Sequence, residues 1–430
     1  MKRIALLAAA AAAAVAAAVA IAWPREDFIP SASPADWAAT PDNIARGAYL
    51  ARAGDCVACH TARGGPEYAG GRALDTPFGR LYGPNLTPDP ETGIGNWSAD
   101  DFWNALHNGK SRDGRLLYPA FPYTNYTKVA RADSDALFAY FRSLAPQHRP
   151  NQPHELAFPY NQQALLAGWR LLYFKPAVFE PQPARGAAWN RGAYLVEGLG
   201  HCSACHSTRN RLGATEGALS GGLIPTIGWY APSLTARGEA GLGDWDKEHI
   251  VALLQTGISP RGSATGPMAE VVARSLQHLT REDVGAMADY LKSLPATDRA
   301  PQGTAQGTNK RAGERPSEQL LAEGRRLYGT YCVDCHGADG KGKAPAYPPL
   351  AGNRAVTLTP AVNAIRIVLN GGFPPGTAGN PRPYGMPPYS HELNDAQVAA
   401  VLTYVRASWG NAAPAVSTPE VNRYRSVPLD

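Results

Sequence analysis

The arrangement of its six cysteines constrains this chain more than any other feature. They fall in three copies of the motif C-x-x-C-H, with none left over, at Cys56–His60, Cys202–His206 and Cys332–His336. Two thiols one helical turn apart can add to the two vinyl groups of one haem, and the adjacent histidine then reaches the iron. A single match would also suit a redox dithiol or half of a zinc site. Three matches without a spare cysteine favour covalent haem.

We therefore predict three covalently attached haem c groups. The predicted attachment residues are Cys56, Cys59, Cys202, Cys205, Cys332 and Cys335. The predicted proximal iron ligands are His60, His206 and His336.

The segments around the motifs repeat as well, which indicates three related domains. A helix is predicted before each motif, at Arg46–Leu50, Arg191–Leu195 and, more loosely, Gly324–Tyr328. Each unit closes with apolar residues at helical spacing, at Asp135–Leu144, Asp283–Leu294 and Asp395–Trp409. These patterns predict an all-α domain around each haem, in which the first and last helices pack together.

Composition completes the predicted organisation. Residues 295–315 are rich in Gly, Thr, Gln and Ala, which is typical of a flexible linker. Residues 151–184 are too apolar for a solvated tether, so we expect them to pack against a domain or a partner. The predicted segments are a signal peptide or N-terminal anchor at 1–24, domain 1 at 40–150, the apolar connection at 151–184, domain 2 at 185–294, the linker at 295–315, domain 3 at 316–410 and a C-terminal tail at 411–430.

The N-terminus has the pattern of an export signal. Lys2 and Arg3 precede an uncharged, Ala-rich stretch from Ile4 to Pro24, and Ala20–Ala22 is a possible cleavage site. About 20 apolar residues also suffice to cross a bilayer, so cleavage and anchoring both stay open. A formal charge of +5 without any long Lys/Arg run argues against a nucleic-acid partner.

Two methionines are natural candidates for the sixth iron ligand, because a thioether is a common second axial ligand in electron-transfer haems. Met1 lies in the signal and Met287 in a closing helix, which leaves two of the four methionines. These are Met268 and Met386, each in a loop before the last helix of its domain. We predict that they complete the second and third haem sites.

The first domain contains no methionine. When Gly109 is aligned with Gly257, Phe121 falls close to the position of Met268, and phenylalanine cannot bind iron. The first haem is therefore either five-coordinate or bound by another group. The other imidazoles in that region belong to His107, His148 and His154.

Three further strings carry a resemblance to a known family. They are Asn85–Asp89, Tyr118–Tyr123 and Asn190–Val196. With them, the chain from its signal to about Trp409 resembles the triple-haem cytochrome c subunit of bacterial membrane-bound dehydrogenases of the alcohol, gluconate, sorbitol and aldehyde type. The resemblance implies three tandem class I cytochrome c domains with loop-rich connections, on the periplasmic side of the inner membrane. Phe121 departs from this family, whose members typically have a methionine there.

The resemblance also implies partners. A separate catalytic subunit with a quinone, flavin or molybdenum cofactor would supply electrons, and ubiquinone or a terminal acceptor would take them. This chain lacks a dinucleotide-binding fingerprint of its own. Our leading hypothesis is an electron-transfer subunit without catalysis of its own. The alternatives are a peroxidase-like enzyme at the first haem and a freestanding periplasmic electron shuttle.

Overall fold

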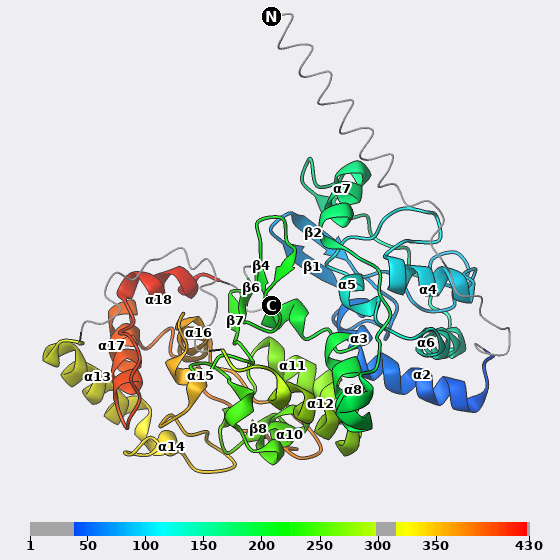
Figure 1. Ribbon diagram of the computed structural model, residues 1–430. Helices are drawn as coiled ribbons and strands as arrows, with labels where there is room; N and C mark the ends of the chain where they lie inside the picture. Colours follow the sequence, from blue (N-terminus) through cyan, green and yellow to red (C-terminus); the bar gives the residue numbers. More distant parts are fainter. Residues whose placement is uncertain (1–37, 225, 298–314, 428–430) are drawn as a thin grey trace, which may run out of the picture. The chain divides into compact units, whose positions relative to one another are not determined.

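Short helices, long loops and small hairpins make up the chain, as the computed structural model shows (Figure 1). It describes residues 38–224, 226–297 and 315–427. They form two compact units. The first holds the described residues up to Pro181, with Val196–His201 and Asn210–Ala214, and the second holds the rest. The predicted signal at 1–24 and most of the predicted linker at 295–315 lie outside the described residues.

The first unit is built on two helices that lie against each other, α2 (Pro41–Ala53) and α6 (Arg131–Ser143). Leu50 and Phe138 are buried in its core. The other elements of this unit are α3 (Cys56–His60), α4 (Ala99–Asn108), α5 (Tyr123–Tyr126), α7 (Gln163–Tyr173) and an antiparallel sheet of β1 (Ala73–Thr76), β2 (Gly79–Tyr82) and β3 (Glu155–Leu156).

The second unit repeats this plan twice. Its first half comprises α8 (Gly186–Glu197, to Leu195 in this unit), α9 (Ser203–His206), α10 (Lys247–Thr256), α11 (Pro267–Arg274) and α12 (Arg281–Ser293). Its second half comprises α13 (Glu318–Tyr331), α14 (Val333–His336), α15 (Arg354–Thr357), α16 (Val362–Asn370), α17 (Asp395–Ala407) and α18 (Thr418–Arg425). Single 3-10 turns lie at Pro183–Arg185, Leu242–Asp244 and Leu276–His278.

One glycine in each first helix explains how closely it packs on the last helix of its domain. A Cβ atom added to Gly47, Gly192 or Gly324 would lie 2.0, 1.9 or 2.3 Å from a carbonyl oxygen of the last helix, that of Ala136, Ala286 or Ala400. In the first two domains the preceding arginine also binds that helix, through the ion pairs Arg46–Asp133 and Arg191–Asp283. In these two domains the Arg-Gly pair thus holds the first helix close against the last one: the glycine allows the close approach, and the arginine forms the ion pair.

The prediction of an all-α fold holds only in part. Short antiparallel hairpins lie between the helices, made by β4 (Thr208–Arg209) with β5 (Thr215–Glu216), β6 (Gly222–Ile224) with β7 (Trp229–Ala231), and β8 (Ile258–Ser259) with β9 (Gly262–Ser263). Strands of two or three residues are too short to show a period-2 pattern in the sequence.

The apolar connection at 151–184 packs against the first unit through α7. Leu166 and Ala167 are buried there, and the side-chain oxygen of Gln163 accepts a hydrogen bond from the amide of Leu116 at 2.8 Å. The outward face of α7 carries exposed leucines, among them Leu172 at 70% exposure.

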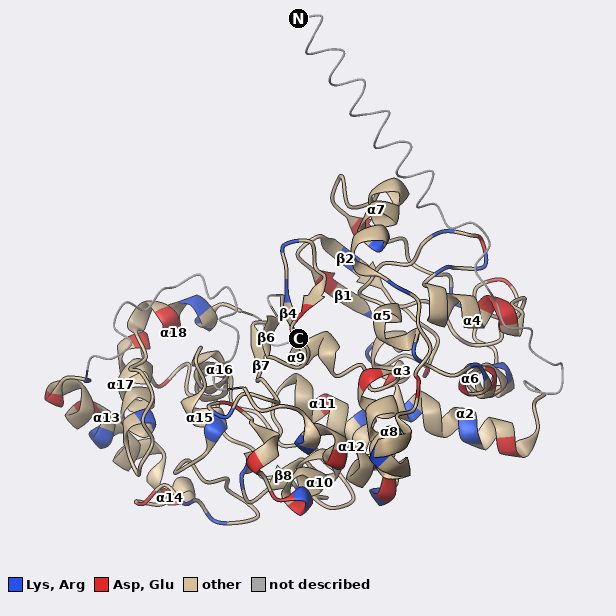
Figure 2. Cartoon of the chain, viewed as in Figure 1, with Lys and Arg blue, Asp and Glu red and all other residues tan. Residues whose placement is uncertain are grey.

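The longer surface helices carry charges of both signs. Acidic and basic residues share helices such as α2 and α18 (Figure 2). Over the ranges that the structure describes, no helix has the length and the apolar character that a membrane span requires.

Candidate haem-binding sites

Each C-x-x-C-H motif forms one helical turn directly after the first helix of its domain. Asp55 and His201 precede the first cysteine in the first two domains, and both have the left-handed backbone conformation, with φ of 47° and 34°. Asp and His are among the residues that tolerate this conformation best. This conformation makes a sharp turn in the backbone directly before the first cysteine of the motif.

All three motif histidines make the same hydrogen bond. The ring Nδ1 of His60 lies 2.8 Å from the carbonyl oxygen of Pro84, that of His206 lies 2.7 Å from Pro232, and that of His336 lies 3.1 Å from Pro348. A carbonyl oxygen only accepts, so Nδ1 carries the hydrogen and Nε2 keeps its lone pair. Each imidazole is therefore oriented and in the tautomer that binds iron through Nε2.

Burial keeps these groups uncharged. It lowers the pKa of His60, His206 and His336 below the usual value, which favours the neutral ring that a metal requires. It raises the pKa of the Cys56 and Cys202 thiols to about 12 and that of Cys332 to about 11. None of the six cysteines, all of which the structure describes, forms a disulfide. Two available thiols and one oriented imidazole on a single turn fit one haem, three times over.

A similar backbone hydrogen bond precedes Phe121 and Met268. Helices α4 and α10 each end at a left-handed glycine, Gly109 and Gly257. The carbonyl of Gly109 accepts from the amide of Leu117, and that of Gly257 from Ala264, both at 2.8 Å. Phe121 follows Leu117 by four residues, as Met268 follows Ala264.

These two side chains have different surroundings. Met268 is half-buried in the first turn of α11, whereas the ring of Phe121 lies 5.3 Å from that of Tyr126 at the edge of the first core. In the third domain the backbone of Met386 pairs with Gly372 through two hydrogen bonds of 2.8 and 3.0 Å.

The three histidines considered as replacement ligands each have another contact. His107 is buried with its ring stacked on that of Trp103 at 4.4 Å. The ring Nδ1 of His148 lies 3.6 Å from a carboxylate oxygen of Asp89, with the side chain 60% exposed. The ring Nδ1 of His154 accepts from the amide of Tyr82 at 3.2 Å.

Sequence reasoning missed two features of these sites. The proline carbonyls belong to the repeated triplets Pro84–Leu86, Pro232–Leu234 and Pro348–Leu350. The first two triplets are recognisable as repeats in the sequence, but nothing there says that their carbonyls face a histidine. The second feature is His201, whose ring lies in the first unit beside Tyr126, at a centroid distance of 5.6 Å.

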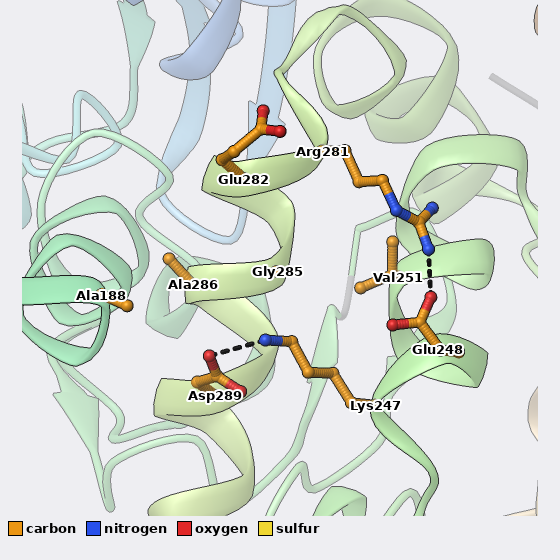
Figure 3. A pocket seen from close by; sticks show the side chains of 9 residues that line it. All are labelled: Ala188, Lys247, Glu248, Val251, Arg281, Glu282, Gly285, Ala286 and Asp289. Atoms are coloured by element: carbon orange, nitrogen blue, oxygen red, sulfur yellow. Dashed lines mark hydrogen bonds and ion pairs between the residues drawn. The ribbon is translucent and has the colours of Figure 1, made fainter.

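A hollow of about 250 Å³ on the second unit is a separate feature (Figure 3). It lies between α8, α10 and α12. Four of its lining side chains form two ion pairs: Lys247 Nζ lies 2.7 Å from Asp289, and Arg281 pairs with Glu248. Its nine lining residues include no predicted haem ligand.

The family model of cytochrome c matches three stretches of the chain, residues 44–145, 190–295 and 321–409. Each stretch contains one C-x-x-C-H motif and its proline triplet.

Whole-chain comparisons extend this likeness. The chain is 40% identical over 399 residues to the gluconate 2-dehydrogenase cytochrome c subunit of Pantoea cypripedii, covering 90% of each protein. It is 36% identical over 406 residues to the alcohol dehydrogenase (quinone) cytochrome c subunit of Gluconobacter oxydans, covering 89% of this chain and 82% of that one. It is also 41% identical over 403 residues to one of the nicotinate dehydrogenase subunits of Pseudomonas putida, but it spans only 33% of that longer protein.

Proposed function

This chain belongs to the cytochrome c family and carries three covalent haem c groups, and from that premise we propose that it is the electron-transfer subunit of a dehydrogenase complex. The observation that carries the proposal is the site repeated three times, in which two thiols outside any disulfide and an imidazole fixed by a proline carbonyl share one helical turn. Haem bound there supplies an iron that cycles between the ferric and ferrous states.

The residues of the chain would divide the work as follows. The six motif cysteines, Cys56, Cys59, Cys202, Cys205, Cys332 and Cys335, would hold the haems by thioether bonds. His60, His206 and His336 would bind the irons through Nε2, which the Nδ1 hydrogen bonds leave available. Met268 and Met386 would add a thioether at the second and third irons, which raises the potential of a haem.

The first haem would keep an open sixth position. Phe121 falls close to the position of Met268 in the sequence alignment, and His107, His148 and His154 each have another contact. The domains around the three haems would be residues 40–150, 185–294 and 316–410, joined by the connection at 151–184 and the linker at 295–315.

The partners follow from what the relatives are. A catalytic dehydrogenase subunit with a quinone, flavin or molybdenum cofactor would donate electrons to this chain, as the names of the gluconate and alcohol dehydrogenase subunits suggest. Ubiquinone or a terminal acceptor would take them. The N-terminal sequence pattern supports export, so the complex would stand on the periplasmic side of the inner membrane.

Purification of the full chain from its native membranes tests this role. We expect a larger catalytic subunit to co-purify and its substrate to reduce all three haems. A cytochrome that is isolated alone and is fully active in electron transfer from a substrate would contradict the proposal.

Phe121 also supports a second candidate, a first haem that binds a small oxidant such as peroxide. Cyanide and peroxide would then change the spectrum of one haem out of three. If neither cyanide nor peroxide changes the spectrum, this candidate is excluded and electron transfer remains the proposed function.

A further inference from the structure

The segment between α8 and the second haem motif contributes to the first unit. Val196–His201 precedes Cys202 in the chain, yet Leu199 is 1% exposed within the core that also contains Leu50 and Val57. The side-chain amide of Asn125 donates to the carbonyl of Glu197 at 2.9 Å, and Lys128 pairs with the carboxylate of Glu197. Glu197 and Leu199 therefore hold this segment on the first unit.

His201 ends this segment against the residues that lead into the first motif. Its ring Nε2 lies 3.4 Å from the carbonyl oxygen of Gly54, a long hydrogen bond in which the nitrogen donates. The hydroxyl of Tyr126 donates to the same carbonyl at 3.3 Å. Leu199 packs on the other side: a Cβ atom at Gly54 would lie 3.4 Å from Cδ2 of Leu199 and 3.3 Å from Sγ of Cys56.

The chain then connects both ends of this contact to a haem attachment site. Gly54 is two residues before Cys56, and His201 is joined to Cys202 by a peptide bond. We propose that His201 is a bridging residue for electron transfer between the first and second haems, with its imidazole linking the Gly54 carbonyl to Cys202. The inference rests on the proposed function in electron transfer, and it adds the residue that connects the first and second haems electronically.

The physical reason is that electrons tunnel more efficiently through covalent and hydrogen bonds than through empty space of the same length. With haem bound at both motifs, one iron would lose the single electron that the other gains, and Gly54, His201 and Cys202 would form the bonded path between the attachment sites. No bond forms or breaks, and no proton moves. The left-handed φ of 34° at His201 is sterically unfavourable for a residue with a Cβ atom, and it places the ring on the Gly54 carbonyl.

The test is the rate of electron redistribution between the haems after laser photoreduction of the full holoprotein by a soluble dye. His201→Asn tolerates the left-handed backbone but is too short to reach Gly54, so we expect a several-fold slower rate between the first two haems. His201→Gln keeps an N–H donor of longer reach and is expected to recover most of the rate. His391→Asn, at an exposed histidine of the second unit, is the matched control and is expected to leave the rate unchanged.

Haem content and the midpoint potentials of all three haems are measured in each variant, because bridging predicts that both stay the same. His201→Phe, which has a ring but no nitrogen, repeats the test if the asparagine variant does not retain three haems. An unchanged rate in the His201→Asn or the His201→Phe variant overturns the proposal. Loss of haem from both variants overturns it too, because His201 would then be needed for assembly of the holoprotein. Complete equilibrium reduction of the haems by the donor leaves the relay function standing in every case.

Discussion

Phe121 falls close to the position of Met268 when the first two domains are aligned by sequence, so an aromatic ring corresponds there to a thioether. Both side chains lie four residues after a similar backbone hydrogen bond, but Met268 lies in the first turn of α11 whereas Phe121 precedes α5. An iron without a strong sixth ligand is high-spin in its ferric state, whereas a thioether makes it low-spin and raises its potential.

Phe121→Met is therefore expected to convert a high-spin signal into a low-spin one and to raise the potential of a single haem. Low-temperature paramagnetic resonance of the oxidised protein and a spectroelectrochemical titration measure the two effects. Phe78→Met is the control, because Phe78 packs on Tyr160, at a ring distance of 4.7 Å, outside this position. If the unaltered protein is already entirely low-spin, another side chain fills the site.

The covalent part of each site was predictable at the residue scale because attachment requires contiguous residues. Cys56, Cys59 and His60 can be read from five consecutive letters. The acceptor of the His60 ring was not predictable, because it is a backbone carbonyl, and the identity of Pro84 carries no signal for it. His201 is similar: its contact with Gly54 joins residues 147 positions apart.

Among the secondary-structure elements, helices were predictable where apolar residues recur at helical spacing over several turns. The closing helix expected at Asp135–Leu144 corresponds to α6, which begins four residues earlier, at Arg131, and ends at Ser143. The hairpins were not predictable, since β8 and β9 have two residues each. The role of Gly324 was not predictable either, because it depends on the carbonyl of Ala400 in a distant helix.

Two glycines of α13 give opposite predictions for the same substitution. Gly→Ala in a helix normally stabilises by about 0.5–1 kcal/mol. Gly329→Ala should do so, because its Cβ would meet nothing within 4 Å. Gly324→Ala should instead lower the melting temperature, because its Cβ would lie 2.3 Å from the carbonyl oxygen of Ala400. Thermal unfolding of the two variants, followed by circular dichroism, compares them directly, and equal melting temperatures would contradict this account of the helix crossing.

Helix α18 provides a prediction for pH. Asn422 donates to the carboxylate of Asp395 at 2.8 Å and Arg425 at 2.5 Å, and these contacts hold the pKa of Asp395 below its usual value. A carboxyl whose folded pKa is depressed stabilises fully above its unfolded pKa of about 3.9. That stabilisation is lost as the pH falls through the folded value, so α18 should loosen in acid.

Asp395→Asn should reproduce this loosening at neutral pH. We expect faster hydrogen exchange in residues 418–425, by the equivalent of about 1 kcal/mol or less because the pair is partly exposed. Glu323→Gln, which removes the exposed pair with Arg326 on α13, is the control and should leave α18 unchanged. Equal exchange in the Asp395 variant and the unaltered protein would show that Val421 and Tyr424 hold the helix alone.

For the whole molecule, the sequence predicted three domains but not which of them hold together. The second and third lie in one compact unit. The side chain of Asn363 in α16 pairs with the backbone of Tyr230 in β7 through hydrogen bonds of 2.9 and 2.7 Å. Arg354 donates to the carbonyl of Ala240 at 2.9 Å. Local patterns carry no information on such pairs, because each partner lies more than a hundred residues from the other.

The double variant Asn363→Ala, Arg354→Ala should uncouple these two domains. Each lost hydrogen bond weakens the contact by about 1 kcal/mol. We expect the second and third domains to unfold in one calorimetric transition in the unaltered protein and in two separate transitions in the variant. The transition of the first domain serves as the internal reference, and an unchanged calorimetric profile would argue against coupling.

The proline carbonyl that accepts from each motif histidine makes one side of the three haems chemically alike. Three chemically identical haems would have equal reduction potentials, and an electron would then pass between them equally readily in both directions. Net electron transfer in one direction requires a difference in reduction potential between the haems. We expect a difference in potential to come from the sixth-ligand side, for which we proposed Met268 and Met386 at the second and third haems and no thioether at the first, where the sequence has Phe121. The direction of electron transfer would then depend on which haem lacks a thioether. Exchanging Phe121 and Met268 should reverse the order of the potentials of the first two haems.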